Sequence, residues 1–132
     1  MYEIIVNSKD KNELIDITSK IQELVAKSNV KEGICNIFTT HATASLIINE
    51  NADPNICTDT INALDKLVPE GIWKHDRIDG NAAAHIKAAI IGCDKTVPVK
   101  DNKLVLGTWQ GIMLAEWDGP RERKVIVNII KS

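Results

Sequence analysis

Aromatic residues are scarce in this chain, with one Phe, one Tyr and three Trp among 132 residues. Proteins that bind single-stranded nucleic acid need aromatic side chains on which bases stack. The formal net charge is −2, so there is also no general excess of positive charge for a phosphate backbone. Both observations argue against nucleic acid as a partner.

Cysteine is scarce as well. Cys35, Cys57 and Cys93 are an odd number and form no CxxC pair, which argues against a disulfide scaffold and against a cysteine zinc cluster. Cys35 and Cys93 lie in apolar stretches, where a cysteine most often behaves as a small buried hydrophobic residue.

Long apolar runs are absent. None approaches the roughly 18 residues that a membrane-spanning helix needs, and residues 1–6 have the pattern of a strand rather than of a signal peptide. We therefore expect a cytoplasmic protein with no membrane partner. The length and the 44% apolar content fit a single domain, residues 1–132, whose core needs no disulfide or structural metal.

The hydrophobic pattern predicts an α+β domain with a mixed, mainly antiparallel sheet and helices packed on it. Helices are expected from a cap at Thr18 or Ser19, from Asp53-Pro54 to about Val68, and over residues 81–91 before Gly92. Residues 69–80 read as a loop. The predicted strands cover residues 3–6, 13–17, 34–39, 45–49, 96–99, 104–106, 110–117 and 124–130.

Two of the predicted strands are apolar on both faces. Residues 112–115 contain no polar side chain, and residues 125–130 contain only Asn128. A sheet with one face in water would alternate more clearly. We therefore expect helices on one face and a second sheet or another subunit on the other, and so a homo-oligomer.

All three histidines fall in polar stretches that suggest one site. The stretches cover residues 41–54, 75–85 and 107–121. His41, His75 and His85 each have carboxylates, amides or hydroxyls nearby in the sequence, and imidazole titrates near neutral pH. Glu50 and Glu116 are the carboxylates that would act with them as general acid or base.

Most of these residues also have a structural interpretation. Ser45 follows His41 closely enough to suggest a serine nucleophile, but a hydroxyl bonded to backbone is the commoner arrangement. Asn49 and Glu50 suit either a ligand site or the capping of a helix start. His85 on an alanine-rich helix face is either a ligand contact or a core histidine, and a loop residue such as His75 is often only solvated.

Further ligand contacts are predicted near the C-terminal end. Gln110 stands between two glycines that permit close backbone approach, so its amide is a candidate ligand group. Arg121 and Arg123 would clamp a phosphate group, or alternatively begin a solvated strand.

A metal site is a further hypothesis, because three imidazoles suit zinc or nickel. The candidate ligands are His41, His75 and His85. No pair has HxH or HxxxH spacing, so no cofactor follows from the pattern alone.

These motifs resemble the YjbQ family, also called UPF0047, over nearly the whole chain. The resemblance rests on His-x-Thr-Ala-Ser and Asn-Glu-Asn-x-Asp-Pro at 41–54, His-Asp at 75–76, Ala-His-x-Lys at 84–87, Gly-Thr-Trp-Gln-Gly-Ile at 107–112, Glu116, and Asp-Gly-Pro-Arg at 118–121. Ala42 and Cys93 depart from it, since a hydroxyl residue and a small serine-like residue are expected there.

The resemblance implies a trimer whose polar pocket lies near the subunit boundary. It also implies a weak thiamine-phosphate synthase activity, which joins a pyrimidine methyl diphosphate to a thiazole phosphate. Departure of diphosphate normally uses a divalent cation such as magnesium, although the sequence has no Asp-rich magnesium motif. The alternative is a non-catalytic trimer that binds a metabolite or anion. The site carried over by the motifs comprises His41, Asn49, Glu50, His75, His85, Gln110 and Glu116.

Overall fold

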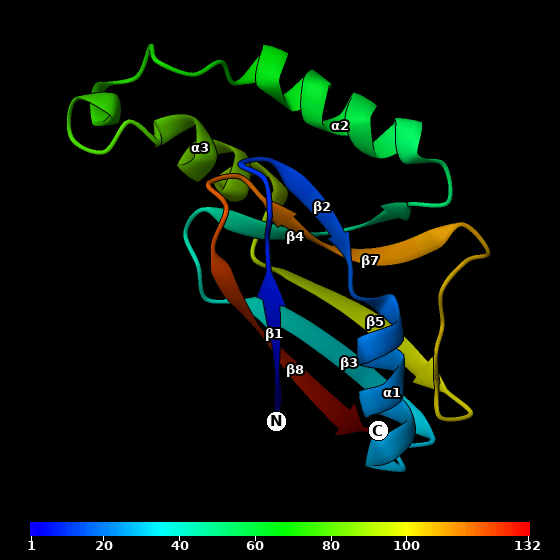
Figure 1. Cartoon of the computed structure of the whole chain (residues 1–132). Coiled ribbons are helices and arrows are strands. Elements are labelled where there is room, and N and C mark those ends of the chain that lie inside the picture. The colour runs from blue at the N-terminus through cyan, green and yellow to red at the C-terminus, as the bar shows by residue number, and fades with distance from the viewer.

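The structure is a computed structural model that describes residues 1–132, and it contains two antiparallel sheets, three α-helices and one 3-10 turn (Figure 1). The elements in chain order are β1 (Tyr2–Asn7), β2 (Glu13–Asp16), α1 (Thr18–Ser28), β3 (Glu32–Thr39), β4 (Ala44–Glu50), α2 (Pro54–Leu67), the 3-10 turn η1 (Lys74–Arg77), α3 (Ala82–Ile91), β5 (Asp94–Lys100), β6 (Lys103–Leu104), β7 (Gln110–Glu116) and β8 (Glu122–Lys131).

The α+β class and the mainly antiparallel pairing are confirmed, but the prediction of a mixed sheet is wrong, since the strands form two purely antiparallel sheets. A five-stranded sheet has the order β1-β8-β3-β5-β6 and a three-stranded sheet has the order β2-β7-β4. Every strand pair is antiparallel. The helical connection from β4 to β5 passes from one sheet to the other, so it creates no parallel neighbours.

The main core lies between the two sheets. Fifteen buried apolar residues form it, and α1 closes one side with Ile21 and Val25. Cys35 is fully buried there, as expected, and burial raises the pKa of its thiol to about 11. Leu46 and Leu114 are also fully buried between the sheets.

Helices α2 and α3 cover the outer face of the three-stranded sheet (Figure 1). Ala84 and Ala88 of α3 pack there against Ala115 and Trp117, which explains why both faces of β7 are apolar. The five-stranded sheet is covered on one face only. Its outer face exposes several apolar side chains, namely Ile5, Ile34, Phe38 and Ile130.

Helix α2 is only lightly buried. Its predicted apolar face contributes Ile61 and Leu64 to the contact, but Leu67 is 68% exposed. A buried ammonium group links α2 to α3, because Lys87 bonds to Asp65 and lies 5.3 Å from the centre of the Trp117 ring.

Local sequence signals account for some of the helix ends. Asp53 caps α2 by accepting the backbone N–H of Asn55 at 2.9 Å, as predicted, and α3 ends at Gly92. The predicted hydroxyl cap of α1 is wrong, since the N-cap is Ile17. The hydroxyl of Thr18 instead accepts the backbone N–H of Ile112 at 2.8 Å, which ties the helix to β7.

None of the helices is long and apolar enough to cross a membrane.

Candidate functional site

An open pocket of about 390 Å³ lies between the turn that precedes β4 and helix α3. His41 from the turn, His85 from α3 and Cys93 before β5 supply its polar groups. The remaining lining residues are alanines and Gly92, so the walls are smooth and carry no carboxylate. Two of the three predicted histidines therefore share one pocket.

His41 is held in a single tautomer. Its Nε2 accepts the backbone N–H of Lys124 at 3.0 Å, so this nitrogen carries no proton and the neutral ring carries its proton on Nδ1. Burial, and after it the positive charge of Arg123, lowers the pKa of His41 below the usual 6.5. At neutral pH, His41 is therefore an uncharged hydrogen-bond donor through Nδ1.

His75 and His85 form an edge-to-face pair with ring centres 5.0 Å apart. The Nδ2 of Asn81 donates to Asp118 Oδ2 at 3.0 Å, which fixes the orientation of the Asn81 amide. Its Oδ1 then faces His75 Nε2 at 3.1 Å, and His75 must donate this bond. Asp76, in the predicted His75-Asp76 motif, caps α3 by accepting the backbone N–H of its first residue.

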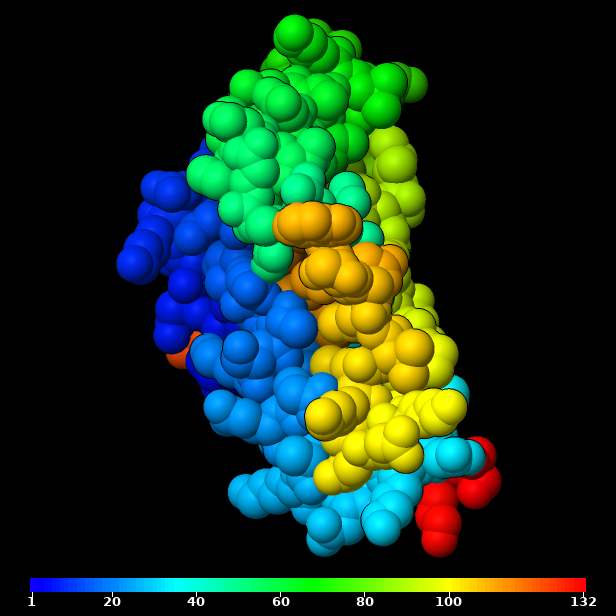
Figure 2. Space-filling model, turned by 90° about the vertical axis from the view of Figure 1, so that its right-hand side faces the viewer, coloured from blue at the N-terminus to red at the C-terminus, as the bar shows by residue number.

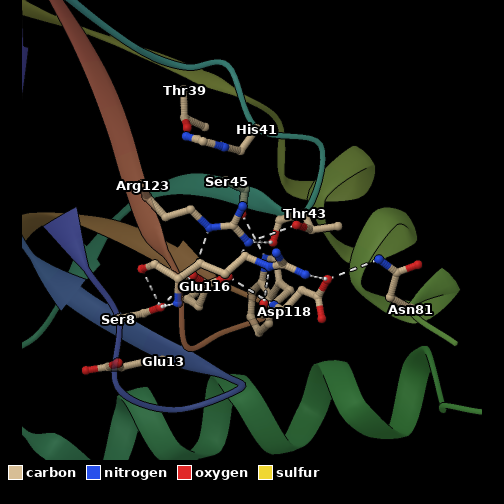
Figure 3. Close-up of polar contacts among 12 residues, drawn as sticks. Ser8, Glu13, Thr39, His41, Thr43, Ser45, Asn81, Glu116, Asp118 and Arg123 are labelled. Carbon is tan, nitrogen blue, oxygen red and sulfur yellow. Dashed lines mark hydrogen bonds and ion pairs between the residues drawn. The ribbon is translucent and has the colours of Figure 1, made fainter. Parts of the chain in front are cut away.

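Arg121 extends this polar chain at the surface. Its Nε donates to the backbone carbonyl of Asp118 at 2.8 Å, and its Nη2 lies 3.2 Å from the Asp118 carboxylate. The side chain of Arg121 is 56% exposed, so it is open to a ligand. Figure 3 shows the side chains of Asn81, just before α3, and Asp118, just after β7, pointing toward one another.

Glu116 and Arg123 form a buried ion pair instead of facing solvent. Arg123 Nε donates to Glu116 Oε1 at 2.8 Å, and Ser8 Oγ donates to the same oxygen at 2.7 Å. Burial opposes ionisation of Glu116, but the bonds from Arg123, Ser8 and the backbone of Asp118 outweigh it and lower the pKa of this carboxyl. Glu116, the predicted general acid or base, and Arg123, the predicted phosphate contact, are therefore bonded to each other.

Asn49, Glu50 and Gln110 lie at the other end of the three-stranded sheet. In the register, Ala44 is opposite Glu116, whereas Glu50 is opposite Gln110. Six residues of strand separate the two ends, or about 20 Å at the usual rise per residue. Within one chain, the residues predicted to form one site are therefore split into two groups.

The Gln110 end is a surface corner. Figure 2 shows the segment that leads into β7 at the surface beside the start of α2. Gly111 contacts the Asn51 side chain so closely that a Cβ would lie 2.5 Å from its Nδ2. Gln110 Oε1 accepts the backbone N–H of Gly107 at 2.8 Å, so its amide also holds the turn.

Two predicted roles are not supported by the geometry. Ser45 is fully buried and its hydroxyl accepts the indole N–H of Trp117 at 3.0 Å, so it is no exposed nucleophile. No three His, Cys, Asp or Glu side chains lie close enough together to hold a metal ion. The Nε2 lone pair of His41 is also occupied by backbone, so the three-histidine set does not fit a zinc, nickel or magnesium ion within one chain.

Sequence reasoning missed four residues of this region. Asn81 and Asp118 orient His75, Thr43 holds the turn after His41, and Cys93 is exposed at the pocket rather than buried as predicted. Asn81 and Asp118 lie within the polar stretches 75–85 and 107–121, so their position in the sequence could have identified them as site residues. Nothing local distinguishes Cys93 from a buried cysteine.

Fold and site together define a class of small protein. Two antiparallel sheets enclose the core, two helices cover the smaller sheet, and histidines from two separate elements face one pocket at its edge.

The chain belongs to the family described as UPF0047 protein YjbQ-like, whose model matches residues 2–132. A UPF0047 protein of Methanocaldococcus jannaschii is 47% identical over 129 residues, which are 98% of this chain and 91% of that protein. The UPF0047 protein YugU of Bacillus subtilis is 35% identical over 95% of each chain.

Solved structures of this family have the same fold. A YbjQ-like protein of unknown function from Sulfolobus solfataricus superposes with a TM-score of 0.96 at 41% identity, covering 99% of this chain and 96% of the other. A YjbQ/UPF0047 family protein from Clostridium acetobutylicum gives 0.95 at 43% identity, covering 98% and 100%.

Proposed function

We propose that this protein is an enzyme that acts on small phosphorylated heterocycles, with a weak thiamine-phosphate synthase type of activity. The observation that carries the proposal is the pocket in which His41, as a fixed neutral donor, faces the same space as His85. Smooth alanine walls suit a flat ring, and the exposed guanidinium of Arg121 suits a phosphate.

In this reaction the thiazole ring nitrogen attacks the methylene carbon of the pyrimidine methyl diphosphate. A C–N bond forms, the C–O bond breaks, and diphosphate leaves with the electron pair. The Nδ1–H of His41 would stabilise charge that develops on an oxygen, and His85 would give a proton to the leaving diphosphate. Arg121 would hold a phosphate group, and no step is assigned to a metal.

A non-catalytic metabolite- or anion-binding protein is the second candidate. One observation favours it: Glu116, the predicted carboxylate partner of the histidines, is buried in an ion pair, and the pocket lining has no carboxylate. Such a pocket would still bind an anion through the Nδ1–H of His41.

Calorimetry and product detection on the same protein separate the two candidates. The enzyme proposal predicts binding of the pyrimidine methyl diphosphate and, with thiazole phosphate present, release of diphosphate. The exposed α1 variant Lys20→Ala is a matched control and should behave like wild type. Binding without turnover would favour the second candidate, and absence of both would defeat the two proposals together.

We also propose that the chain forms a head-to-tail trimer. The split of the predicted site supports this, because a neighbouring copy can bring Glu50 and Gln110 to the histidine pocket. Trp109, beside Gln110, is 66% exposed, and Ile90, beside the pocket on α3, is 58% exposed. A ring of heterologous contacts between these two ends would bury both side chains.

Light scattering at micromolar concentration should therefore give the mass of three chains for the wild type. The Trp109→Glu variant should give the mass of one chain, because a charge at a closely packed contact opposes association. Ile72→Glu is the control, since Ile72 is 67% exposed on a separate loop and should leave the trimer intact. A monomeric wild type would refute the trimer.

A further inference from the structure

The buried Glu116–Arg123 pair lies beside the turn that carries His41. Figure 3 shows the Arg123 guanidinium between the His41 turn and the Glu116 carboxylate. We propose that this ion pair is a positioning device, which acts through Thr43 to hold His41 as a neutral donor toward the pocket. The inference deepens the proposed function and rests on it for its catalytic meaning.

Arg123 makes contacts in two directions. On one side, its Nε and Nη2 bond to the two oxygens of Glu116 at 2.8 and 2.5 Å. On the other, Nη2 donates to the hydroxyl of Thr43 at 2.8 Å and to its backbone carbonyl at 3.3 Å. The planar guanidinium thereby transmits the fixed position of the Glu116 carboxylate to Thr43.

The same end of β8 also holds the histidine ring. Lys124 follows Arg123 directly, and its backbone N–H is the donor to His41 Nε2. Two successive residues of one strand therefore fix both ends of the short turn from His41 to Thr43. If Thr43 were released, the turn would move relative to Lys124 and the His41 bond would weaken.

Arg123 is also suited to keep the His41 ring uncharged. Burial is the largest cause of the lowered pKa of His41. Among the charged groups, Arg123 comes first and disfavours a proton, Glu116 favours one, and Lys124 and Arg121 disfavour it. His85 from α3 and Cys93 before β5 share its pocket. With one ring nitrogen accepting a backbone N–H and cations predominating, the second proton is disfavoured.

A buried ion pair is not needed for stability alone, because apolar residues of similar volume often serve equally well. An ion pair at this place can fix the position of Thr43, because the guanidinium donates hydrogen bonds to both its hydroxyl and its carbonyl. An apolar cluster has no donor for these two groups. Glu116 and Arg123 are thus positioning residues that act through His41, and neither is required to touch substrate.

Nitrogen-15 NMR of the free protein tests this directly. In the wild type, His41 should show an unprotonated Nε2 and a protonated Nδ1. In Thr43→Val the two signals should move toward an exchanging average, and the titration midpoint of His41 should rise by about half a pH unit or more. Thr43→Ser keeps the hydroxyl and should restore the wild-type spectrum.

A purely structural role predicts a different result. In that case Thr43→Val would lower stability while the His41 nitrogen signals and midpoint stayed unchanged, and this would overturn the proposal. Arg123→Lys provides a second test. It keeps the positive charge but cannot make the guanidinium hydrogen bonds to Glu116 and Thr43 together, so it should also disturb the tautomer of His41. These spectra need no substrate, so they remain decisive if the proposed reaction fails its own assay.

Discussion

Replacing Arg123 by methionine is expected to lower the free energy of unfolding by about 3–5 kcal/mol at pH 7. The Glu116 carboxylate is fully buried, and without Arg123 its charge would keep only the Ser8 hydroxyl and the backbone N–H of Asp118. Urea denaturation followed by circular dichroism measures the loss. Arg121→Met is the matched control: its ion pair with Asp118 is exposed, so its cost should stay below about 1 kcal/mol.

The loss of stability in Arg123→Met should also depend on pH in a defined direction. Because the pKa of Glu116 is lowered in the folded state from 4.5, its ion pair contributes stability above that value. This contribution is lost as the pH falls through the folded-state pKa. The difference in stability between wild type and Arg123→Met should therefore shrink between pH 7 and about pH 3. An equal difference at both pH values would show that Glu116 ionisation is not its cause.

The double variant Glu116→Gln, Arg123→Met is the internal check on this account. It removes both charges, so it should regain much of the stability lost in Arg123→Met. If it is less stable than the single variant, packing volume rather than an unpaired carboxylate would explain the loss.

Replacing His85 by alanine is expected to reduce kcat/KM for diphosphate release by about 10²–10⁴-fold. His85 lines the pocket, and no protein hydrogen bond occupies its ring, so among the histidines it is the one free to donate a proton to a leaving group. Steady-state release of diphosphate provides the measurement, with Asn62→Ala on the exposed side of α2 as the control.

The binding measurement refines this result. If His85→Ala loses turnover but still binds the pyrimidine methyl diphosphate with wild-type affinity, His85 acts in the chemical step. If binding is lost in the same proportion, His85 contributes to ground-state affinity instead. Turnover equal to that of wild type would remove His85 from the mechanism.

Local features of this protein could be predicted from its sequence with good physical reason. The Asp53-Pro54 helix start and the Gly92 helix end depend on a few neighbouring residues, because a cap and a left-handed or extended terminal residue are local matters. The strands followed in the same way from their apolar patterns, and the histidine-rich stretches could be singled out as a site.

Pairing between distant residues could not be predicted in this way. Whether Arg123 meets a phosphate or Glu116 depends on the register of β7 and β8 and on which side chains their ends turn inward. Whether Glu50 lies near Glu116 depends on its position along the same strand pair. Neither the Arg123–Glu116 contact nor the distance between Glu50 and Glu116 can be predicted from a short segment of sequence.

The sequence by itself determined the α+β class, the order of the elements, the local helix signals around α2 and α3, and the polar stretches that contain the histidines, because hydrophobic period and backbone propensity act over a few residues. Only the tertiary structure decided that the strands form two sheets, that His41 is a fixed donor, that Glu116 is enclosed with Arg123, and that Glu50 and Gln110 lie at the far end. These outcomes depend on distances between segments far apart in the chain, which are set when apolar faces pack and buried polar groups find partners.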